Sequence, residues 1–256
     1  MLYNITSSKN EKYKFFKSLK TKKARTQSGC YTVEGKKSVK DAIEAEEKIA
    51  SLLVSESFYN DENFVYPEKT DVYIISDVNF GNLSSTENPQ GIIAVLYQKN
   101  IDNKPDGINN YVYCDRIQDP GNLGTIIRTA DAAGFAGVIL SEDCVDLYNP
   151  KTVRSSMGSF FHVQKFTGEN LLEYKQLGYS IVCGVLSDSA VEYTQADFTK
   201  PVIIVIGNEA NGISDKILDI ADIFVKIPID GKAESLNAGV AAALLMYEVR
   251  RQRKDN

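Results

Sequence analysis

Three segments in the second half of the chain place the strongest limits on its fold. Residues 115–128, 204–212 and 227–237 each begin in or directly after a hydrophobic run of strand type and then break at Gly, Pro or Asn. In open α/β sheets, ligands bind where the carboxyl ends of strands give way to such loops. Three of these loops in one region predict a composite site at one edge of a sheet.

The hydrophobic periodicity predicts two α/β regions joined by a polar linker. We expect a small α/β domain over residues 1–100, a turn-rich linker over 101–110 and a larger domain over 111–256. The larger domain should hold a mostly parallel sheet with helices on both faces. Helices are predicted at 9–23, 38–47, 122–133, 168–177, 213–221 and 235–253. Strands are predicted at 30–33, 50–55, 72–76, 91–97, 111–117, 137–141, 160–166, 180–186, 201–207 and 223–229.

The charge of the chain is distributed unevenly. The whole sequence carries a net charge of −5, but residues 1–40 hold eleven Lys/Arg against two acids, a local charge of +9. A basic end on an acidic protein predicts a localised contact with a polyanion such as RNA. The candidates are Lys20, Lys22, Lys23 and Arg25. A solvated helix face is the alternative, because charge runs are common there.

Cysteine and histidine usage gives little support for a metal site. The four cysteines form no Cys-x-x-Cys pair, and there is one histidine. We therefore expect neither a metal centre nor a disulfide framework. No apolar run approaches the roughly 20 residues that a membrane span needs, and the first residues lack the apolar stretch of a secretory signal. These patterns predict a cytoplasmic protein without a membrane partner.

The three segments together resemble the SpoU family of RNA ribose 2′-O-methyltransferases, in the SPOUT class of S-adenosylmethionine enzymes. The first is similar to the family signature D-P-x-N-x-G-x-x-x-R-T-A, the second to G-N-E-x-x-G, and the third to I-P-x-x-G-x-x-x-S-L-N. The matching positions are Asp119, Pro120, Asn122, Gly124, Arg128, Thr129 and Ala130; Gly207, Asn208, Glu209 and Gly212; and Ile227, Pro228, Gly231, Ser235, Leu236 and Asn237.

The resemblance implies a fold, a reaction and partners. It implies a trefoil-knotted, mostly parallel α/β domain, preceded by a smaller α/β domain that recognises RNA. It also implies S-adenosyl-L-methionine as cofactor, ribosomal RNA or tRNA as substrate, and a homodimer formed through the C-terminal domains.

The resemblance also assigns residues to roles. At the reaction centre it implies Asn122, Arg128, Glu209, Ser235 and Asn237. Around the cofactor it implies Leu186, Ile206, Gly207, Asn208, Ile227, Pro228, Ser235 and Leu236. The stretch 154–158 is similar to a family segment near the RNA, which adds Arg154 to the RNA-binding candidates.

Methyl transfer to a ribose hydroxyl requires alignment of two reactants and removal of a proton from a weak acid. A guanidinium keeps its proton, so we interpret Arg128 as a clamp on the RNA phosphate that stabilises the developing alkoxide, with the phosphate as candidate proton acceptor. Glu209 follows a buried strand and needs a partner, for which Arg128 is an obvious candidate. Asn122, Ser235 and Asn237 precede or begin helices, so helix capping is an alternative role for each.

Two other functions compete with this interpretation. A dinucleotide-binding domain needs G-x-G-x-x-G with an acid about 20 residues later, and Gly121 and Gly124 lack a third glycine in register. A non-catalytic RNA-binding module on the same fold is the second alternative. Binding of S-adenosylmethionine would separate that module from an enzyme.

Overall fold

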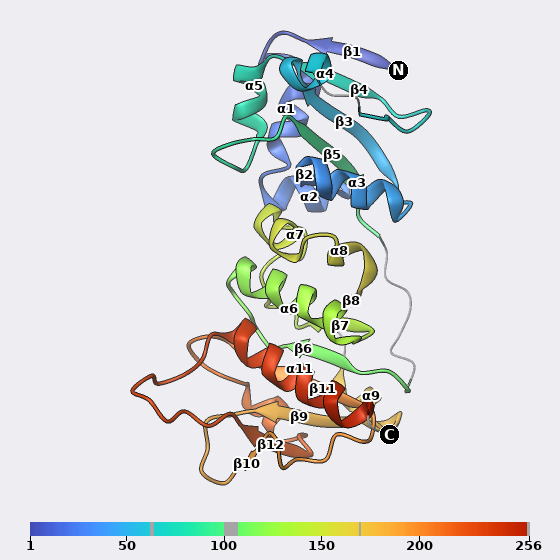
Figure 1. The fold of residues 1–256 in the computed structure, drawn as a ribbon. Helices are drawn as coiled ribbons and strands as arrows, with labels where there is room; N and C mark the ends of the chain where they lie inside the picture. Colours follow the sequence, from blue (N-terminus) through green and yellow to red (C-terminus); the bar gives the residue numbers. More distant parts are fainter. Residues whose placement is uncertain (62–63, 100–106, 169, 255–256) are drawn as a thin grey trace. The chain divides into compact units, whose positions relative to one another are not determined.

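The computed structural model of this chain describes residues 1–61, 64–99, 107–168 and 170–254. It contains two compact units (Figure 1). The N-terminal unit comprises Met1–Asn100 and Tyr148–Phe161, and the C-terminal unit comprises Ile101–Leu147 and His162–Asn256. Of the predicted linker, residues 101–106 lie outside the described residues.

The N-terminal unit is built on a five-stranded sheet in the order β1-β4-β3-β5-β2. The first three strands of this order are mutually parallel, whereas β5 runs antiparallel to both of its neighbours. Strand β1 has no counterpart in the sequence predictions. The strands are β1 (Leu2–Ile5), β2 (Cys30–Glu34), β3 (Ile49–Ser55), β4 (Val72–Ile75) and β5 (Ile92–Tyr97).

Two short helices replace the single helix predicted at 9–23. The first ends at Ser18, with Leu19 as its C-cap. The Thr21 hydroxyl then accepts a hydrogen bond from the amide of Ala24 and caps the second. Tyr13, Phe16 and Leu19, the predicted apolar face, are buried against the sheet in one core cluster. The helices of this unit before the linker are α1 (Glu11–Ser18), α2 (Lys22–Ser28), α3 (Lys36–Glu44), α4 (Glu56–Asp61) and α5 (Asp77–Leu83).

Residues 148–161 pack with the N-terminal unit, although the sequence places them inside a continuous domain over 111–256. The Tyr31 ring lies 4.7 Å from that of Tyr148 and 5.8 Å from that of Phe160, measured between centroids. This contact removes apolar ring surface of all three side chains from water, which explains why residues 148–161 belong to the N-terminal unit. The predicted outer boundaries, at 100 and 111, stay predictions.

The strand predicted at 160–166 is wrong in its first half. Helix α7 (Pro150–Ser156) begins with Asn149 as N-cap and Pro150 in its first turn, and α8 (Ser159–His162) follows. Only Gln164–Thr167 forms a strand, β8. The apolar run at 160–163 was too short for periodicity to distinguish a helical turn from a strand.

The C-terminal unit contains a seven-stranded sheet that is parallel throughout, in the order β10-β12-β9-β11-β6-β7-β8. This confirms the predicted α/β domain with a mostly parallel sheet. Its central strands are near-continuous apolar runs, as expected for strands buried on both faces. The remaining strands are β6 (Tyr111–Cys114), β7 (Gly137–Leu140), β9 (Ser180–Gly184), β10 (Val191–Glu192), β11 (Val202–Ile206) and β12 (Ile223–Lys226).

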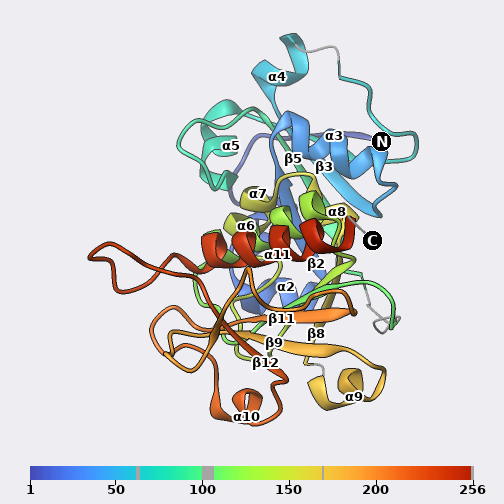
Figure 2. The same ribbon diagram turned by 60° about the horizontal axis from the view of Figure 1, so that its bottom comes forward.

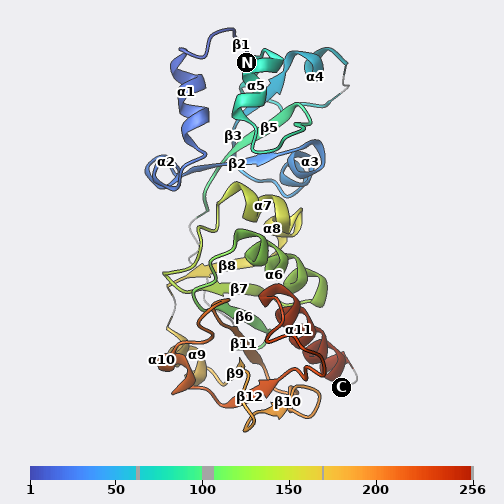
Figure 3. The same ribbon diagram turned by 90° about the vertical axis from the view of Figure 1, so that its left-hand side faces the viewer.

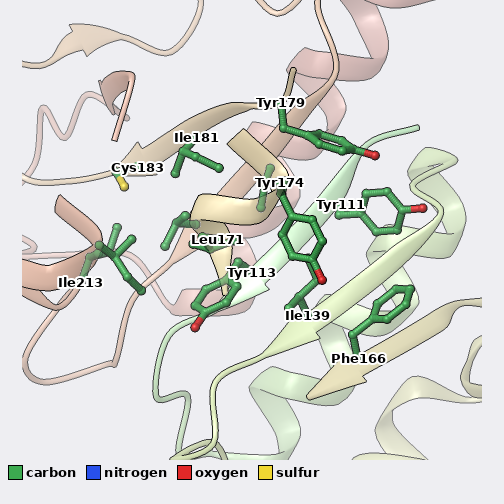
Figure 4. Close-up of a cluster of buried hydrophobic side chains, with 13 residues drawn as sticks. Tyr111, Tyr113, Ile139, Phe166, Leu171, Tyr174, Tyr179, Ile181, Cys183 and Ile213 are labelled. Carbon is green, nitrogen blue, oxygen red and sulfur yellow. The ribbon is translucent and has the colours of Figure 1, made fainter. Parts of the chain in front are cut away.

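Helices cover both faces of this sheet. Helices α6 (Pro120–Ala133) and α11 (Ala238–Lys254) lie side by side on one face, and α9 (Leu171–Gln176) and α10 (Asp215–Leu218) lie on the other (Figures 2 and 3). The core under α9 joins aromatic and aliphatic side chains, including Tyr111, Phe166, Tyr174 and Tyr179 (Figure 4). The knot implied by the family resemblance stays a prediction.

Within the described residues, no helix has both the length and the apolar character that crossing a membrane would require.

Candidate active site

A pocket of about 730 Å³ opens at the carboxyl edge of the parallel sheet. Its walls come from the ends of β9, β11 and β12 and from the start of α11, so two of the three motif segments line it directly. Parallel strands bring their carboxyl ends to the same edge, which is why segments far apart in sequence meet here.

Seven of the eight predicted cofactor residues line this pocket, and Pro228 does not. The lining side chains are largely aliphatic, with polar groups gathered at the loops that follow β11 and β12. The seven are Leu186, Ile206, Gly207, Asn208, Ile227, Ser235 and Leu236.

The loop after β11 is closed tightly on itself. The backbones of Asn208 and Gly212 exchange two hydrogen bonds, of 3.0 and 2.9 Å. A Cβ atom added to Gly207 would collide with the carbonyl carbon of Gly212, so only glycine fits there. The Asn208 side chain accepts from the amides of Ala210 and Asn211 and donates to the carbonyl of Arg116 at 2.8 Å. Asn208 therefore holds the shape of the loop that forms one wall of the pocket.

A chain of side-chain hydrogen bonds joins all three motif segments. Asn122 on α6 donates from Nδ2 to Glu209 Oε1 at 2.9 Å, and its Oδ1 accepts from Asn237 Nδ2 at 2.8 Å. Glu209 and Asn237 both line the pocket. The predicted composite site is thus present as one hydrogen-bonded unit.

The capping alternatives resolve differently for the two asparagines. Asp119, rather than Asn122, caps α6, because its side chain accepts from the amide of Asn122 at 2.9 Å. The Asn122 side chain is therefore available for Glu209 and Asn237. Asn237 both caps a helix and belongs to the side-chain network. Its Oδ1 accepts from the amides of Gly239 and Val240 at the start of α11, while its Nδ2 donates to Asn122.

Glu209 is held by the first motif through three donors. Its oxygens accept from the backbone amides of Gln118 and Asp119, at 3.2 and 3.3 Å, and from Asn122. Partial burial raises the pKa of Glu209, but these hydrogen bonds outweigh it, so the pKa lies below its usual value. A carboxylate stabilised in its charged form and occupied by three donors is a positioning group and a poor proton acceptor.

The predicted partnership between Glu209 and Arg128 is wrong, because backbone amides and Asn122 satisfy the carboxylate instead. Arg128 lies on the exposed face of α6, six residues after Asn122. Its guanidinium makes no hydrogen bond or ion pair with any described residue. Arg128 does not line the pocket, and its five N–H donors are available to a ligand beside it.

Sequence reasoning missed the support beneath these loops. Asp115, fully buried at the end of β6, accepts from the amide of Ser214 at 2.7 Å and pairs with Arg116 at 3.1 Å. Arg116, with a left-handed backbone (φ 57°), also donates to the carbonyl of Gly212 at 3.1 Å. An acid directly after a buried strand was a readable signal, but Ser214, whose amide donates to it, lies 99 residues away and could not be inferred from the sequence.

The predicted RNA-binding residues divide into two groups. Arg25 is 2% exposed and donates to the carbonyl of Leu19, so its inclusion in a surface patch is corrected: it belongs to the interior. Lys20 donates to the carbonyls of Asn82 and Ser84 and braces that loop. Lys22, Lys23 and Arg154 are exposed.

Among the described residues, no group of three or more His, Cys, Asp or Glu side chains is arranged to hold a metal ion. His162 lies 3.4 Å from Asp131 through Nδ1, away from the pocket lining.

Comparison with known proteins agrees with this geometry. Residues 109–247 match the family model of the SpoU rRNA methylases, and residues 10–94 match that of an MRM3-like substrate binding domain. The 23S rRNA (guanosine(2553)-2′-O)-methyltransferase RlmP of Bacillus subtilis is 36% identical over 96% of this chain and 98% of its own length.

Solved structures share the fold over the same extent. The AdoMet-bound rRNA methyltransferase of Sinorhizobium meliloti superposes with a TM-score of 0.86 at 31% identity, covering 98% of both chains. The SpoU methyltransferase AviRb of Streptomyces viridochromogenes, in complex with AdoMet, gives a TM-score of 0.85 at 28% identity over 96% of this chain and 99% of that one. With its three motifs joined at one pocket, the chain belongs to the SpoU rRNA methylase family, the RNA ribose 2′-O-methyltransferases that use S-adenosylmethionine.

Proposed function

We propose that this chain transfers the methyl group of S-adenosylmethionine to a ribose 2′-hydroxyl of ribosomal RNA. The observation that carries the proposal is the hydrogen-bonded unit Glu209–Asn122–Asn237, which ties all three family motifs to the edge of one pocket. The relative from Bacillus subtilis, which is matched over nearly its whole length, is a 23S rRNA methyltransferase. This relative favours 23S rRNA over tRNA as substrate.

The pocket suits the proposed cofactor in size and chemistry. Its volume of about 730 Å³ falls in the range of roughly 300–1,000 Å³ typical of small-molecule sites. Leu186, Ile206 and Ile227 offer apolar surface for an adenine ring, and the backbone at Gly207 can be approached closely because no side chain intervenes. When bound, S-adenosylmethionine supplies a methyl group made electrophilic by its sulfonium sulfur.

The residues of the chain align the hydroxyl and stabilise its loss of a proton. Arg128 binds the phosphate next to the target ribose and stabilises the negative charge that develops on the 2′-oxygen. Asn122 and Asn237 are fixed by Glu209 and offer amide groups beside the pocket. Since the Glu209 oxygens already accept three hydrogen bonds, the proton passes to an RNA phosphate oxygen or water.

A methyl-transfer assay with a chemically matched RNA tests this function. The full chain should transfer radiolabelled methyl from S-adenosylmethionine to a 23S rRNA transcript. The same RNA with a single 2′-deoxy substitution at the mapped nucleotide should bind and accept no methyl. Methylation of the deoxy substrate would move the reaction to a base atom. Absence of both transfer and calorimetric binding of the cofactor would leave the chain as a non-catalytic RNA-binding module.

We further propose a homodimer formed through α11. Val240, Leu244 and Tyr247 are 47, 37 and 46% exposed and recur on one side of this helix, while Leu245 and Met246 are buried under the other. An apolar stripe of this kind is what a two-fold interface would cover. Light scattering should give twice the 28.4 kDa chain mass, and Leu244→Lys with Tyr247→Lys should return the chain mass. A wild-type mass of 28.4 kDa at micromolar concentration would contradict the dimer.

From the proposed rRNA substrate we infer a cytoplasmic location. We also infer that Lys22, Lys23 and Arg154 help to hold the RNA. Lys22 and Lys23 lie exposed in the first turn of α2, and Arg154 donates to the Ser85 hydroxyl at 3.2 Å. Each guanidinium or ammonium group retains donors that a phosphate could accept from.

A further inference from the structure

A second pocket, of about 490 Å³, lies in the N-terminal unit beside the start of α3. Three lysines from α3, Lys36, Lys37 and Lys40, line it together with Phe58 and Gln90. None of these described lining residues carries a carboxylate. These lysines are part of the same basic segment of 40 residues whose other members include the buried Arg25 and the loop-bracing Lys20.

The wall of this pocket is fixed before any ligand arrives. The Gln90 side chain accepts from the amide of Lys36 at 2.8 Å. Gly35 has φ of +100°, and an added Cβ would lie 3.0 Å from that same Gln90 oxygen. Glycine therefore allows the loop that carries Gln90 to lie directly against the first turn of α3.

Glu34, directly before this glycine, holds the preceding part of the same loop. Its carboxylate accepts from the hydroxyls of Ser84, Ser85 and Thr86 and from the Ser85 amide, the last at 2.9 Å. The acid adjacent to the lysine cluster is thus committed to the loop 84–86 and does not pair with the ammonium groups of Lys37 and Lys40.

Two of the three lysines carry charges that pair with no described residue. Lys37 and Lys40 are exposed, and their ammonium groups make no hydrogen bond or ion pair with the described residues. They are three positions apart and so lie on one side of the helix. The next residue along, Asp41, has a carboxylate oxygen 2.6 Å from where a Cβ of Gly158 would lie, so it is directed at that backbone.

We propose that this pocket, formed by Lys37, Lys40 and Lys36 around Gln90, binds backbone phosphates of the substrate RNA. The inference rests on the proposed function and adds a site within the segment that matches a substrate binding domain. A chain of net charge −5 attracts a polyanion only where cations are concentrated. Lysine ammonium groups act as point charges for phosphate, and Phe58 with the lysine stems forms an apolar floor for the adjoining sugar.

The test compares two double substitutions that remove equal charge. Lys37→Gln with Lys40→Gln should lower the log–log salt slope of binding to a 23S rRNA transcript by about 1.4, at roughly 0.7 per lost single-strand phosphate contact. If the variant and the wild type bind equally at 1 M salt, this change in slope corresponds to a roughly 25-fold loss of affinity for the variant at about 0.1 M salt. Lys9→Gln with Lys12→Gln, exposed lysines on the N-terminal side of the same unit, should change the slope by much less.

Further readouts separate a phosphate-binding pocket from a general effect of charge. Lys37→Arg with Lys40→Arg should retain the slope, because the charge remains. Inorganic phosphate at millimolar concentration should compete little, since one phosphate cannot replace a backbone. An unchanged slope for the glutamine pair, or an equal loss in the Lys9/Lys12 control, overturns the proposal. Failure of the wild type to methylate RNA would overturn the proposed function, while the salt slope would still report on the pocket.

Discussion

The carboxyl edge of the parallel sheet and the lysine pair Lys37 and Lys40 on α3 differ in where their polar groups find hydrogen-bond partners. At the sheet edge, Glu209, Asn122 and Asn237 are satisfied by one another and by backbone amides. On α3, Lys37 and Lys40 have no partner among the described residues. Preorganised groups that fix the geometry of a reaction have their partners in the protein, whereas cations that recognise a polyanion leave their partners to the ligand.

Arg128 stands between these two types and gives the largest expected effect. It belongs to the reaction motif, yet its guanidinium is exposed and unpaired among the described residues. If it clamps the phosphate and stabilises the alkoxide, Arg128→Ala should reduce turnover roughly 100- to 1,000-fold, which corresponds to about 2.7–4 kcal/mol. Single-turnover methyl transfer at saturating RNA measures this loss.

Two controls sharpen the Arg128 result. Arg128→Lys should restore little activity, since an ammonium lacks the planar fork that grips two oxygens at once. Calorimetric affinity for S-adenosylmethionine should stay near that of the wild type. Full turnover in Arg128→Ala would move this residue to the class of solvated surface cations.

Arg25 tests the same comparison with a cation whose partner lies inside the protein. The sequence groups it with surface lysines, but the structure buries it. Removing its charge-assisted hydrogen bonds in Arg25→Ala should cost about 1.5–3 kcal/mol of local stability. Hydrogen exchange of α1 and α2 amides should accelerate roughly 10- to 150-fold, since exchange reports local opening. Lys22→Ala, three residues earlier and exposed, should alter exchange by less than about threefold. Equal behaviour of the two variants would contradict the burial of Arg25.

The sequence predicted the parallel sheet and the meeting of its three loops, since apolar strand runs and Gly/Asn breaks are local signals. It also predicted most of the cofactor pocket through the family motifs, with Pro228 outside the lining. The hydrogen-bond partners of the site residues could not be predicted from the sequence. Glu209 was paired with Arg128 because opposite charges attract, but the amides of Gln118 and Asp119 reach the carboxylate first, and only the folded backbone places them there.

The basic N-terminal segment was predicted less well, for a related reason. A count of charges cannot tell which cations the fold uses internally. The helix predicted at 9–23 is interrupted, Thr21 caps a second helix, and Arg25 on that helix is buried. Gly35 and Gln90 shape the pocket around Lys37 and Lys40. Helices α7 and α8 were likewise missed, because the apolar run at 160–163 was too short for periodicity to distinguish a helical turn from a strand.

Glu209→Gln tests how far the hydrogen bonds within the site support the reaction. The glutamine keeps the shape but replaces one carboxylate oxygen with an NH₂ group. Either the Gln118 amide, or the Asp119 amide together with Asn122, then loses its acceptor. The free energy of unfolding should fall by about 1 kcal/mol, since the site is partly exposed and such hydrogen bonds are worth less there. Turnover should drop more than cofactor affinity, as Asn122 and Asn237 lose their fixed positions. Glu87→Gln, an exposed glutamate in a loop, is the matched control.

The smallest expected effect is the pH dependence of the difference in unfolding free energy between the wild type and Glu209→Gln. Because the pKa of Glu209 is lowered in the folded state, its ionised form stabilises the fold. This contribution is fully present above the unfolded pKa, about 4.3, and is lost as the pH falls through the lower folded value. The gap in unfolding free energy between wild type and Glu209→Gln should therefore stay constant from pH 7 to about 5.5 and narrow below about 4.5. Urea unfolding at each pH measures both proteins, and taking their difference cancels Glu248, whose pKa the Arg251 hydrogen bond also lowers. A gap that widened on acidification would mean that Glu209 is protonated more readily in the folded chain, and its hydrogen bonds would then no longer explain the order of the site.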